Sequence, residues 1–472
     1  MEVGLSFLGK RAAMYSSKDF TRVCTGVLFA TMLASCEVNI SFTNQQRLAI
    51  TCITSSVNVE TPDYAFTETG SMAQSGYSQT LVKLSDGKIL IFGGVSKFEQ
   101  SAEIYDPETG LFTETYEMNN KRLYGTGSLL PDGRVLLAGG YDTTDARATK
   151  TTEIYSPMTG KFVNGPDMVE PKYDFTATAL NNGTILLVGG WNSNNSMSSA
   201  QIYNPVSGTF TTVGSLNKPR TLHTASLLPD GRVIIIGGFN GTTYLNDAEI
   251  YNPTTMVFSL LKTTMSDTRS AHQAVILSDG RIFISGGHNT STLSSTAIYN
   301  PSTGLFTATA HLPTAVYGHT ATLLPNGKVL ILGGYNSYTN LSYSNAEFYD
   351  PETNTYEIII KGLGFDVCYH RAILLNNDRV LITGGYRVKK DIKLDSAYLF
   401  SAGDANIIPG ELKCEGSGGD GNYTYSIKSG DGKIDDAGLF NTDSAIKTQS
   451  VTVQVVDGEG TVATTDINVI ID

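Results

Sequence analysis

Residues 223–258 read HTASLLPDGRVIIIGGFNGTTYLNDAEIYNPTTMVF, and the fold can be predicted from this stretch. Two apolar runs, 224–228 and 233–236, flank a Pro-Asp-Gly sequence, and Asp-Gly between β-favouring segments is a strong hairpin signal. The second run ends in Gly237-Gly238, where the missing Cβ allows positive φ or a close backbone approach. These features predict two antiparallel strands.

Two more strands follow in the same stretch. The third is expected over 248–251 and the fourth near 256–258. The Asn-Pro-Thr-Thr sequence between them has the composition of a turn. The stretch therefore predicts one four-stranded antiparallel meander.

This unit occurs seven times along the chain of 472 residues. Its glycine pairs are 46 to 51 residues apart and begin at Gly93, Gly139, Gly189, Gly237, Gly286, Gly333 and Gly384. In six units a tyrosine precedes an aromatic residue by seven positions, as in Tyr105/Phe112, Tyr155/Phe162, Tyr203/Phe210, Tyr251/Phe258, Tyr299/Phe306 and Tyr349/Tyr356. A sheet of four short strands cannot bury both of its faces alone, so repetition at this period predicts a seven-bladed β-propeller.

A glycine pair followed by a tyrosine, six residues and a large aromatic residue resembles the kelch repeat. The kelch family usually has tryptophan at the last position, where this chain has Phe or Tyr. That substitution keeps a large apolar ring. The propeller repeat with a Trp-Asp dipeptide has a period of about 40–45 residues and is excluded, because the chain holds a single Trp and its period is longer.

The composition agrees with an all-β secreted protein, with 48 Gly, 24 Tyr, 19 Phe and only 17% charged residues. The formal net charge is −12. Nucleic-acid binding needs clustered Lys and Arg that release counterions, and the part of the chain after its amino-terminal signal has no basic run. We therefore expect no nucleic-acid partner.

The amino terminus has the pattern of a secretory signal. Its apolar run, 23–35, is too short to cross a bilayer, which takes about 20 residues. The run ends in Leu-Ala-Ser-Cys, which resembles the bacterial lipobox, so we expect Cys36 to carry the lipid of a membrane-anchored lipoprotein. The alternative is an ordinary signal peptide with an incidental cysteine. We expect a signal over 1–35 with Met14 as its true start, and a lipidated tether over 36–60 in the bacterial cell envelope.

Three cysteines remain beyond the signal and the lipid site, namely Cys52, Cys368 and Cys414. This odd number in an oxidising compartment leaves their pairing unassigned. No CxxC or Cys/His spacing supports a zinc site, and we expect no metal and no cofactor.

The propeller is expected over 61–405 and should be closed by a strand from its amino terminus. Residues 65–72 read AFTETGSM and resemble the fourth strand of the first complete unit, LFTETYEM. The seventh unit has three expected strands and no aromatic fourth strand. We therefore expect residues 65–69 to complete blade seven, with Phe66 opposite Tyr398, which leaves no open sheet edge.

The repeat stops after residue 405. Short expected strands at 423–427, 450–456 and 464–471 alternate with Gly-rich turns. This pattern resembles the small immunoglobulin-like modules of bacterial surface proteins. It predicts an immunoglobulin-like β-sandwich over 406–472.

Recognition should concentrate on the propeller face that carries the long loops after the glycine pairs, because variable loops on a rigid frame commonly bind partners. Two residue types recur at the start of the innermost strand on this face. A basic residue stands 17 positions before four glycine pairs, and a histidine stands 14 positions before four: Arg122, Lys172, Arg220 and Arg269, then His223, His272, His319 and His370. Either these side chains bond carbonyls between blades, or they form a polar ring for an anionic or sugar-like ligand.

Kelch propellers with an immunoglobulin-like tail include copper radical oxidases that resemble galactose oxidase. Tyr369-His370 matches that family's axial tyrosine and histidine ligand, and Tyr173 matches its radical tyrosine. Trp191 lies one residue short of the stacking tryptophan. The crosslinking cysteine is absent, since Gly125 and Tyr124 stand at the two positions where it would be expected, and no histidine follows His370 to supply the second ligand. The matches therefore imply common blade ancestry, and we expect no copper site.

These features together predict a non-catalytic binding module that recognises a protein or carbohydrate partner through the loop-rich face. The alternative is a kelch-type enzyme acting on a sugar, an epimerase or an oxidase. An epimerase would need only a base and a charged clamp, and the fold alone does not decide between the two.

Overall fold

The computed structural model describes residues 49–54, 64–96, 99–359 and 362–401, together with the tail strands between residues 412 and 469. It divides into two units, one of Met1–Pro62 with Ala405–Asp472 and one of Asp63–Asp404. The described residues are nearly all strand and turn, with one short 3₁₀ helix, η1 (Val388–Lys390). None of the helical residues in these ranges forms a helix long and apolar enough to span a bilayer.

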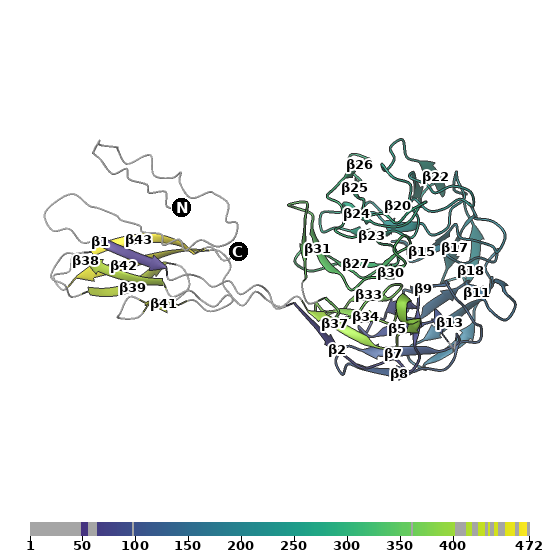
Figure 1. The fold of residues 1–472 in the computed structure, drawn as a ribbon, viewed down its shortest axis with the longest axis horizontal. Helices are drawn as coiled ribbons and strands as arrows, with labels where there is room; N and C mark the ends of the chain where they lie inside the picture. The colour runs from purple at the N-terminus through teal and green to yellow at the C-terminus, as the bar shows by residue number, and fades with distance from the viewer. Residues whose placement is uncertain are drawn as a thin grey trace. The chain divides into compact units, whose positions relative to one another are not determined.

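The larger unit is a propeller of seven four-stranded antiparallel sheets (Figure 1). Its first strands contact one another in a closed circle around the axis. They are β4 (Thr80–Lys83), β9 (Thr126–Leu129), β15 (Thr176–Ala179), β19 (Thr224–Leu227), β23 (Gln273–Ile276), β27 (Thr320–Leu323) and β33 (Arg371–Leu374). We number the blades one to seven in this order.

The second strands carry the core, because all four residues of each are buried. They are β5 (Ile89–Phe92), β10 (Val135–Ala138), β16 (Ile185–Val188), β20 (Val233–Ile236), β24 (Ile282–Ser285), β28 (Val329–Leu332) and β34 (Val380–Thr383). Their side chains pack between blades, as where Leu186 and Val188 of blade three meet Val233 and Ile235 of blade four. Each such buried aliphatic side chain contributes about 1.5–3 kcal/mol.

The third and fourth strands hold the repeated aromatic pair. The third strands are β7 (Ala102–Asp106), β13 (Thr152–Ser156), β17 (Ala200–Asn204), β21 (Ala248–Asn252), β25 (Thr296–Asn300), β31 (Ala346–Asp350) and β37 (Ala397–Ser401). The fourth are β8 (Leu111–Glu114), β14 (Lys161–Asn164), β18 (Thr209–Thr212), β22 (Val257–Leu260), β26 (Leu305–Ala308), β32 (Thr355–Ile358) and, in blade seven, β2 (Ala65–Glu68). Tyr251 stands directly opposite Phe258, with ring centroids 4.8 Å apart. The seven-residue spacing in the sequence is therefore a cross-strand pair.

The glycine pair is needed because each blade docks here on the next one. The Gly238 N–H donates to the carbonyl oxygen of Arg269 in the following blade at 2.8 Å. A Cβ on Gly237, which has φ +61°, would lie 2.7 Å from the same oxygen. Any side chain at this position would push the two blades apart.

Blade seven is closed by β2, which pairs antiparallel with β37 (Figure 1). The register differs from our expectation. Phe66 pairs with Phe400, with ring centroids 5.0 Å apart, and Tyr398 pairs with Glu68. The reason is that Phe400 occupies the place of the repeated tyrosine on the third strand, while Tyr398 occupies the place held by glutamate in four other blades.

The smaller unit contains two sheets. One has the order β1-β38-β41-β40, with β1 (Ala49–Thr54), β38 (Leu412–Ser417), β41 (Leu439–Asn441) and β40 (Lys433–Ile434), and the other has β39 (Tyr423–Ser429), β42 (Gln449–Asp457) and β43 (Val462–Val469). The last three strands lie where the sequence predicted them. An irregular tether was expected over 36–60, and β1 shows that part of it is a paired strand. Its sequence, Ala-Ile-Thr-Cys-Ile-Thr, is rich in β-branched residues, which favour strands.

Candidate functional site

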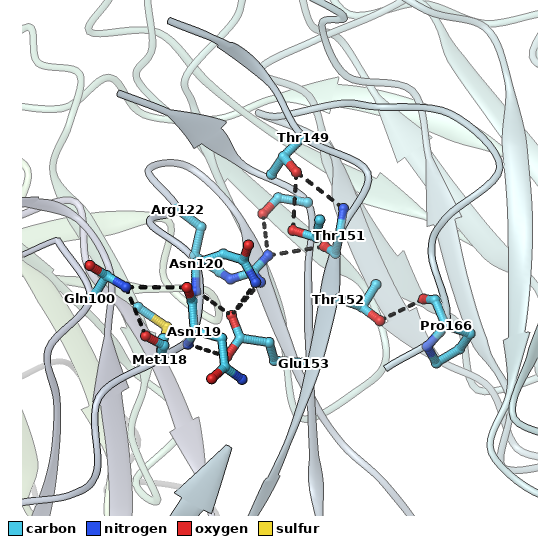
Figure 2. A network of polar contacts seen from close by, with 11 residues as sticks. Gln100, Met118, Asn119, Asn120, Arg122, Thr149, Thr151, Thr152, Glu153 and Pro166 are labelled. Atoms are coloured by element: carbon cyan, nitrogen blue, oxygen red, sulfur yellow. Dashed lines mark hydrogen bonds and ion pairs between the residues drawn. The ribbon is translucent and has the colours of Figure 1, made fainter. Parts of the chain in front are cut away.

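The repeated basic residues lie inside the blades and not on the loop-rich surface. Arg122 is 1% exposed, and its guanidinium donates to the carbonyl oxygens of Gly139 and Thr151 at 2.8 and 3.0 Å. It also donates to the Glu153 carboxylate at 2.6 Å (Figure 2). Glu153 in turn accepts the backbone N–H groups of Asn119 and Asn120. The arginine therefore ties the start of a blade to its own second and third strands.

The three other repeated cations occupy the equivalent position in blades three, four and five, and they are also buried. Arg220 bonds the Gly237 carbonyl oxygen and two carboxylates, those of Asp247 and Glu249. Arg269 bonds the carbonyl of Gly286 and both oxygens of Ser295, and burial lowers its pKa to about 10. Lys172 donates to Ser199, and burial lowers its pKa to about 8. Of the two interpretations of these residues, their contacts fit the structural one.

The repeated histidines are also buried, and each bonds a hydroxyl group in the preceding blade. The Nε2–Oγ distances are 3.0 Å for His223 to Thr176, 2.9 Å for His272 to Thr224, 2.9 Å for His319 to Ser285 and 2.9 Å for His370 to Thr320. Burial lowers the pKa of His223, His319 and His370 to about 3 and that of His272 well below its usual value. These imidazoles are neutral links between blades.

A different set of side chains surrounds the mouth of the channel on the loop-rich face. The residue directly after each glycine pair forms a short antiparallel bridge with the residue three positions before the first strand. In blades two to seven this residue carries a ring and is partly exposed. We call these six residues the crown: Tyr141, Trp191, Phe239, His288, Tyr335 and Tyr386.

Further rings join the crown residues of neighbouring blades. Tyr317 lies 5.2 Å from His288, 5.3 Å from Tyr335 and 6.1 Å from Tyr369, measured between ring centroids. Tyr173 lies 5.5 Å from Tyr141 in an edge-to-face arrangement. The structure thus places three sequence candidates, Tyr173, Trp191 and Tyr369, in or beside one aromatic rim.

Next to the rim residues, seven residues with φ between +50° and +61° form a circle, one from each blade: Ser78, Tyr124, Asp174, Leu222, Ala271, Gly318 and Tyr369. Backbone hydrogen bonds of 2.7 to 3.4 Å join five pairs of neighbours in this circle, as where the Asp174 N–H donates to the Tyr124 carbonyl oxygen. The left-handed conformation of these residues turns the chain from the connecting loop into the first strand. The circle is rigid because its members are bonded to the next blade.

Two opposite charges influence each other at this circle. Asp174 belongs to blade three and Arg371 to blade seven, and blades one and two separate them along the ring. Burial raises the pKa of the Asp174 carboxyl group to about 7, and Arg371 acts to lower it. The Arg371 Nε donates to the carbonyl oxygen of Gln79 at 2.6 Å. The mouth therefore combines a carboxyl group that titrates near neutrality with a fixed guanidinium group.

The residues present do not fit a copper radical centre. His370 would be the metal ligand, but its Nε2 bonds Thr320 at 2.9 Å. A Cβ at Gly125 would lie 2.9 Å from the Gly139 carbonyl oxygen, so the crosslinking cysteine has no room at that position. Among the described residues no group of three His, Cys, Asp or Glu side chains could hold a metal ion. We derive no chemical step through copper.

Comparison with known proteins identifies the repeat. Residues 125–334 match the model of the KLHDC2/KLHL20/DRC7 kelch-repeats domain, and residues 318–359 match the kelch motif. The repeats are kelch repeats. A search among curated proteins found no match.

The kelch propeller also resembles a solved structure, a novel fungal alcohol oxidase of the AA5 family in complex with copper. The TM-score is 0.59 at 14% sequence identity, over 87% of this chain and 100% of the oxidase chain. At this identity the likeness shows the fold alone. It agrees with the kelch propeller found here and assigns no chemistry to the channel.

Asp174, Arg371 and most of the crown were missed in the sequence analysis. Residues that recur at one position stand out in the sequence, and in this fold such residues hold the repeat together. Arg371 stands 13 positions before its glycine pair, where five other blades have threonine. A departure from the repeat at this position was the available signal. The crown could have been found as a ring-bearing residue directly after six glycine pairs.

One pocket of the described residues lies elsewhere. It has a volume of about 580 Å³ and is lined by residues of blades one and two, including Asp86, Tyr116 and Pro157. These residues belong to the tight turns and outer strands. The opposite charges in its lining, Lys88 and Asp106, already form an ion pair with each other at 2.9 Å. We therefore place the candidate site at the mouth.

Proposed function

We propose that this kelch propeller is a binding module and that its loop-rich face recognises a polypeptide partner. The observation that carries the proposal is the crown, a set of partly exposed ring side chains on a rigid circular frame. Tyrosine and tryptophan are enriched at protein interfaces and supply much of their binding energy. Because their positions are fixed by bridges to the blade starts, little conformational entropy is lost on binding.

The two charges at the mouth would orient the partner. Arg371 can donate to a carboxylate or carbonyl group of the partner, while ionised Asp174 can accept from an amide or ammonium group. Hydrogen bonds to charged groups contribute about 1.5–3 kcal/mol when they form in a partly desolvated site. We therefore expect the partner to insert a polar residue at the centre of an aromatic contact.

The proposal extends to the rest of the chain. The Leu-Ala-Ser-Cys sequence at Cys36 supports a lipid anchor in the bacterial cell envelope, although Cys36 lies outside the described residues. Seven described strands in sheets of four and three support an immunoglobulin-like module in the smaller unit. The strand β1 supplies the seventh strand, which the short tail lacked by itself.

A selection experiment tests the proposed function. A random peptide display library is selected on the immobilised full chain, and the affinity of the selected peptides is then measured for variants. The double variant Trp191→Ala, Tyr335→Ala should bind at least about tenfold more weakly, a loss of about 1.4 kcal/mol. The control is Tyr116→Ala, which removes a tyrosine that is more exposed than the crown residues and lies near the tight turns, and this variant should bind normally.

Two outcomes would contradict a polypeptide partner. Peptides that bind the crown variant as well as the wild type would show that the face is not used. Crown-dependent binding seen on a glycan array, without any selected peptide, would assign the face to a carbohydrate.

An enzyme acting on a sugar is the second candidate, and the Asp174/Arg371 pair favours it. A carboxyl group with a pKa near 7 opposite a guanidinium group offers a base and an anion clamp. Turnover of sugar epimerase substrates by the wild type and its loss in Asp174→Asn would establish this function. Equal signals from both proteins would exclude Asp174 as the base.

A further inference from the structure

Two cysteines occupy directly opposed positions in the smaller unit. In the antiparallel pair of β1 and β38, Cys52 is the register partner of Cys414. The sequence left the pairing of the three remaining cysteines unassigned, because their number is odd, and residues 52 and 414 are 362 positions apart. The fold brings these two positions together while Cys368 stays within the propeller.

The register of this pair belongs to an unbroken ladder. The strands β1 and β38 pair in six consecutive positions, from Ala49 with Ser417 to Thr54 with Leu412. The pair of Cys52 and Cys414 lies inside this run, so no irregularity of the ladder stands between it and its neighbours.

Direct opposition satisfies the distance that a disulfide needs. Facing residues of an antiparallel pair have Cα atoms about 4.5–5.5 Å apart, and disulfides span Cα distances of about 4.4–6.8 Å. Facing residues also lie on the same face of the sheet. We propose that Cys52 and Cys414 form a disulfide that fastens β1 to β38.

The bond forms by thiol–disulfide exchange with an oxidised dithiol protein or glutathione disulfide. One cysteine thiolate attacks the acceptor disulfide, and the second thiolate resolves the mixed disulfide. The two thiols lose two protons and two electrons, and the acceptor disulfide becomes two thiols. The product closes a loop that contains the whole propeller.

The third cysteine provides an internal control. Cys368 is fully buried, and its thiol donates to the Tyr386 carbonyl oxygen at 3.4 Å. Burial raises the pKa of this thiol to about 12, which disfavours the reactive thiolate. Cys368 should therefore stay a free thiol under oxidation.

Peptide mapping tests the proposal. The full chain is equilibrated with glutathione disulfide, denatured in maleimide without reductant and digested with trypsin. We expect peptide 48–83 to be joined to peptide 414–428, with a mass lower by two hydrogens than the sum of both. Cys368 should carry maleimide, and reduction before alkylation should separate the two peptides and label both.

Variants distinguish the proposed pair from others. In Cys52→Ser, peptide 414–428 should lose its link to peptide 48–83 and carry either maleimide or glutathione on Cys414, and in Cys414→Ser the same should hold for Cys52. Complete labelling of both residues in the oxidised wild type would overturn the proposal. A crosslinked peptide that joins either residue to Cys24, Cys36 or Cys368 would also overturn it.

Discussion

At the residue scale, one glutamate position on the third strands shows how buried charge is balanced in this propeller. The Glu153 carboxylate forms an ion pair with Arg122 and accepts hydrogen bonds from two backbone N–H groups. Glu347, at the same position of blade six, has neither an ion pair nor a backbone donor of this kind among the described residues. Valine stands at the cation position of that blade, and Pro313, which has no N–H, occupies the place of one donor. Asn345 donates to Glu347 at 3.4 Å. Burial therefore raises the pKa of Glu347 to about 7.

This raised pKa predicts that Glu347 makes stability depend on pH. The folded state holds its proton up to about pH 7, while the unfolded chain releases it near pH 4.5, so stability falls as pH rises between these values. Glu347→Gln should remove this loss and stabilise the protein above pH 7 by up to about 3 kcal/mol, with little effect at low pH. Urea unfolding at several pH values measures the free energy of unfolding of the wild type and of this variant.

Glu153→Gln is the matched control. It leaves Arg122 charged and buried without its carboxylate, so it should destabilise the protein at every pH tested, by about 3–5 kcal/mol. Equal pH profiles for Glu347→Gln and the wild type would show that Glu347 is already ionised in the fold.

The repeated arginines lead to a second prediction at this scale. Arg220→Ala leaves two buried carboxylates, those of Asp247 and Glu249, without their partner and should cost about 3–5 kcal/mol. Arg269→Ala leaves mainly neutral oxygens and should cost about 1–3 kcal/mol. Thermal unfolding compares the two variants. An unchanged melting temperature in both would contradict their role as links within the blade.

The same residues show what sequence could reveal about the site. Arg122 and His223 could be selected from the sequence because residues of their type recur at the same position in several blades. They recur because each blade needs the same hydrogen bonds, within the blade for the cation and to the preceding blade for the histidine. Asp174 and Arg371 each occur once, so repetition did not point to them, and the signal at Arg371 was its departure from the threonine of five other blades. Only the closed ring brings blade three and blade seven to opposite sides of one opening, because the two residues are 197 positions apart.

At the scale of elements, the propeller could be predicted almost strand by strand, because each blade repeats the same hairpin, glycine and turn signals. Closure of blade seven was also predicted, since residues 65–68 resemble a fourth strand that lacks its own blade. The register was wrong by two residues because Phe400 replaces the tyrosine that marks this place elsewhere. The strand β1 was missed because its partner, β38, lies at the other end of the chain.

Deletion of the closing strand should destabilise the propeller. Removing residues 61–70 exposes the edge of β37 and the ring of Phe400, which packs on Phe66. Loss of one large buried aromatic contact costs about 3–5 kcal/mol. Removing residues 407–472 leaves all seven blades intact and should change the melting temperature of the propeller much less. Equal melting temperatures for the two truncations would mean that β2 does not stabilise the ring.

At the scale of the whole molecule, the channel mouth depends on the ring being closed. Asp174 stands on blade three and Arg371 on blade seven, so their charges can interact only when the ring is closed. Their interaction therefore reports on the whole frame. Removal of Arg371 should raise the pKa of Asp174 further, since the guanidinium group is what lowers it.

A double-mutant cycle can measure this coupling across the channel. Arg371→Gln, Asp174→Asn and the double variant are unfolded in urea above and below pH 7. Above pH 7 the carboxylate is ionised, and we expect a coupling of about 1–2 kcal/mol, the attraction of two charges several ångströms apart in a partly polar medium. Well below pH 7 the carboxyl group is protonated in the fold, so the coupling should vanish. A coupling that is the same at both pH values would mean that the two side chains interact through packing and not through charge.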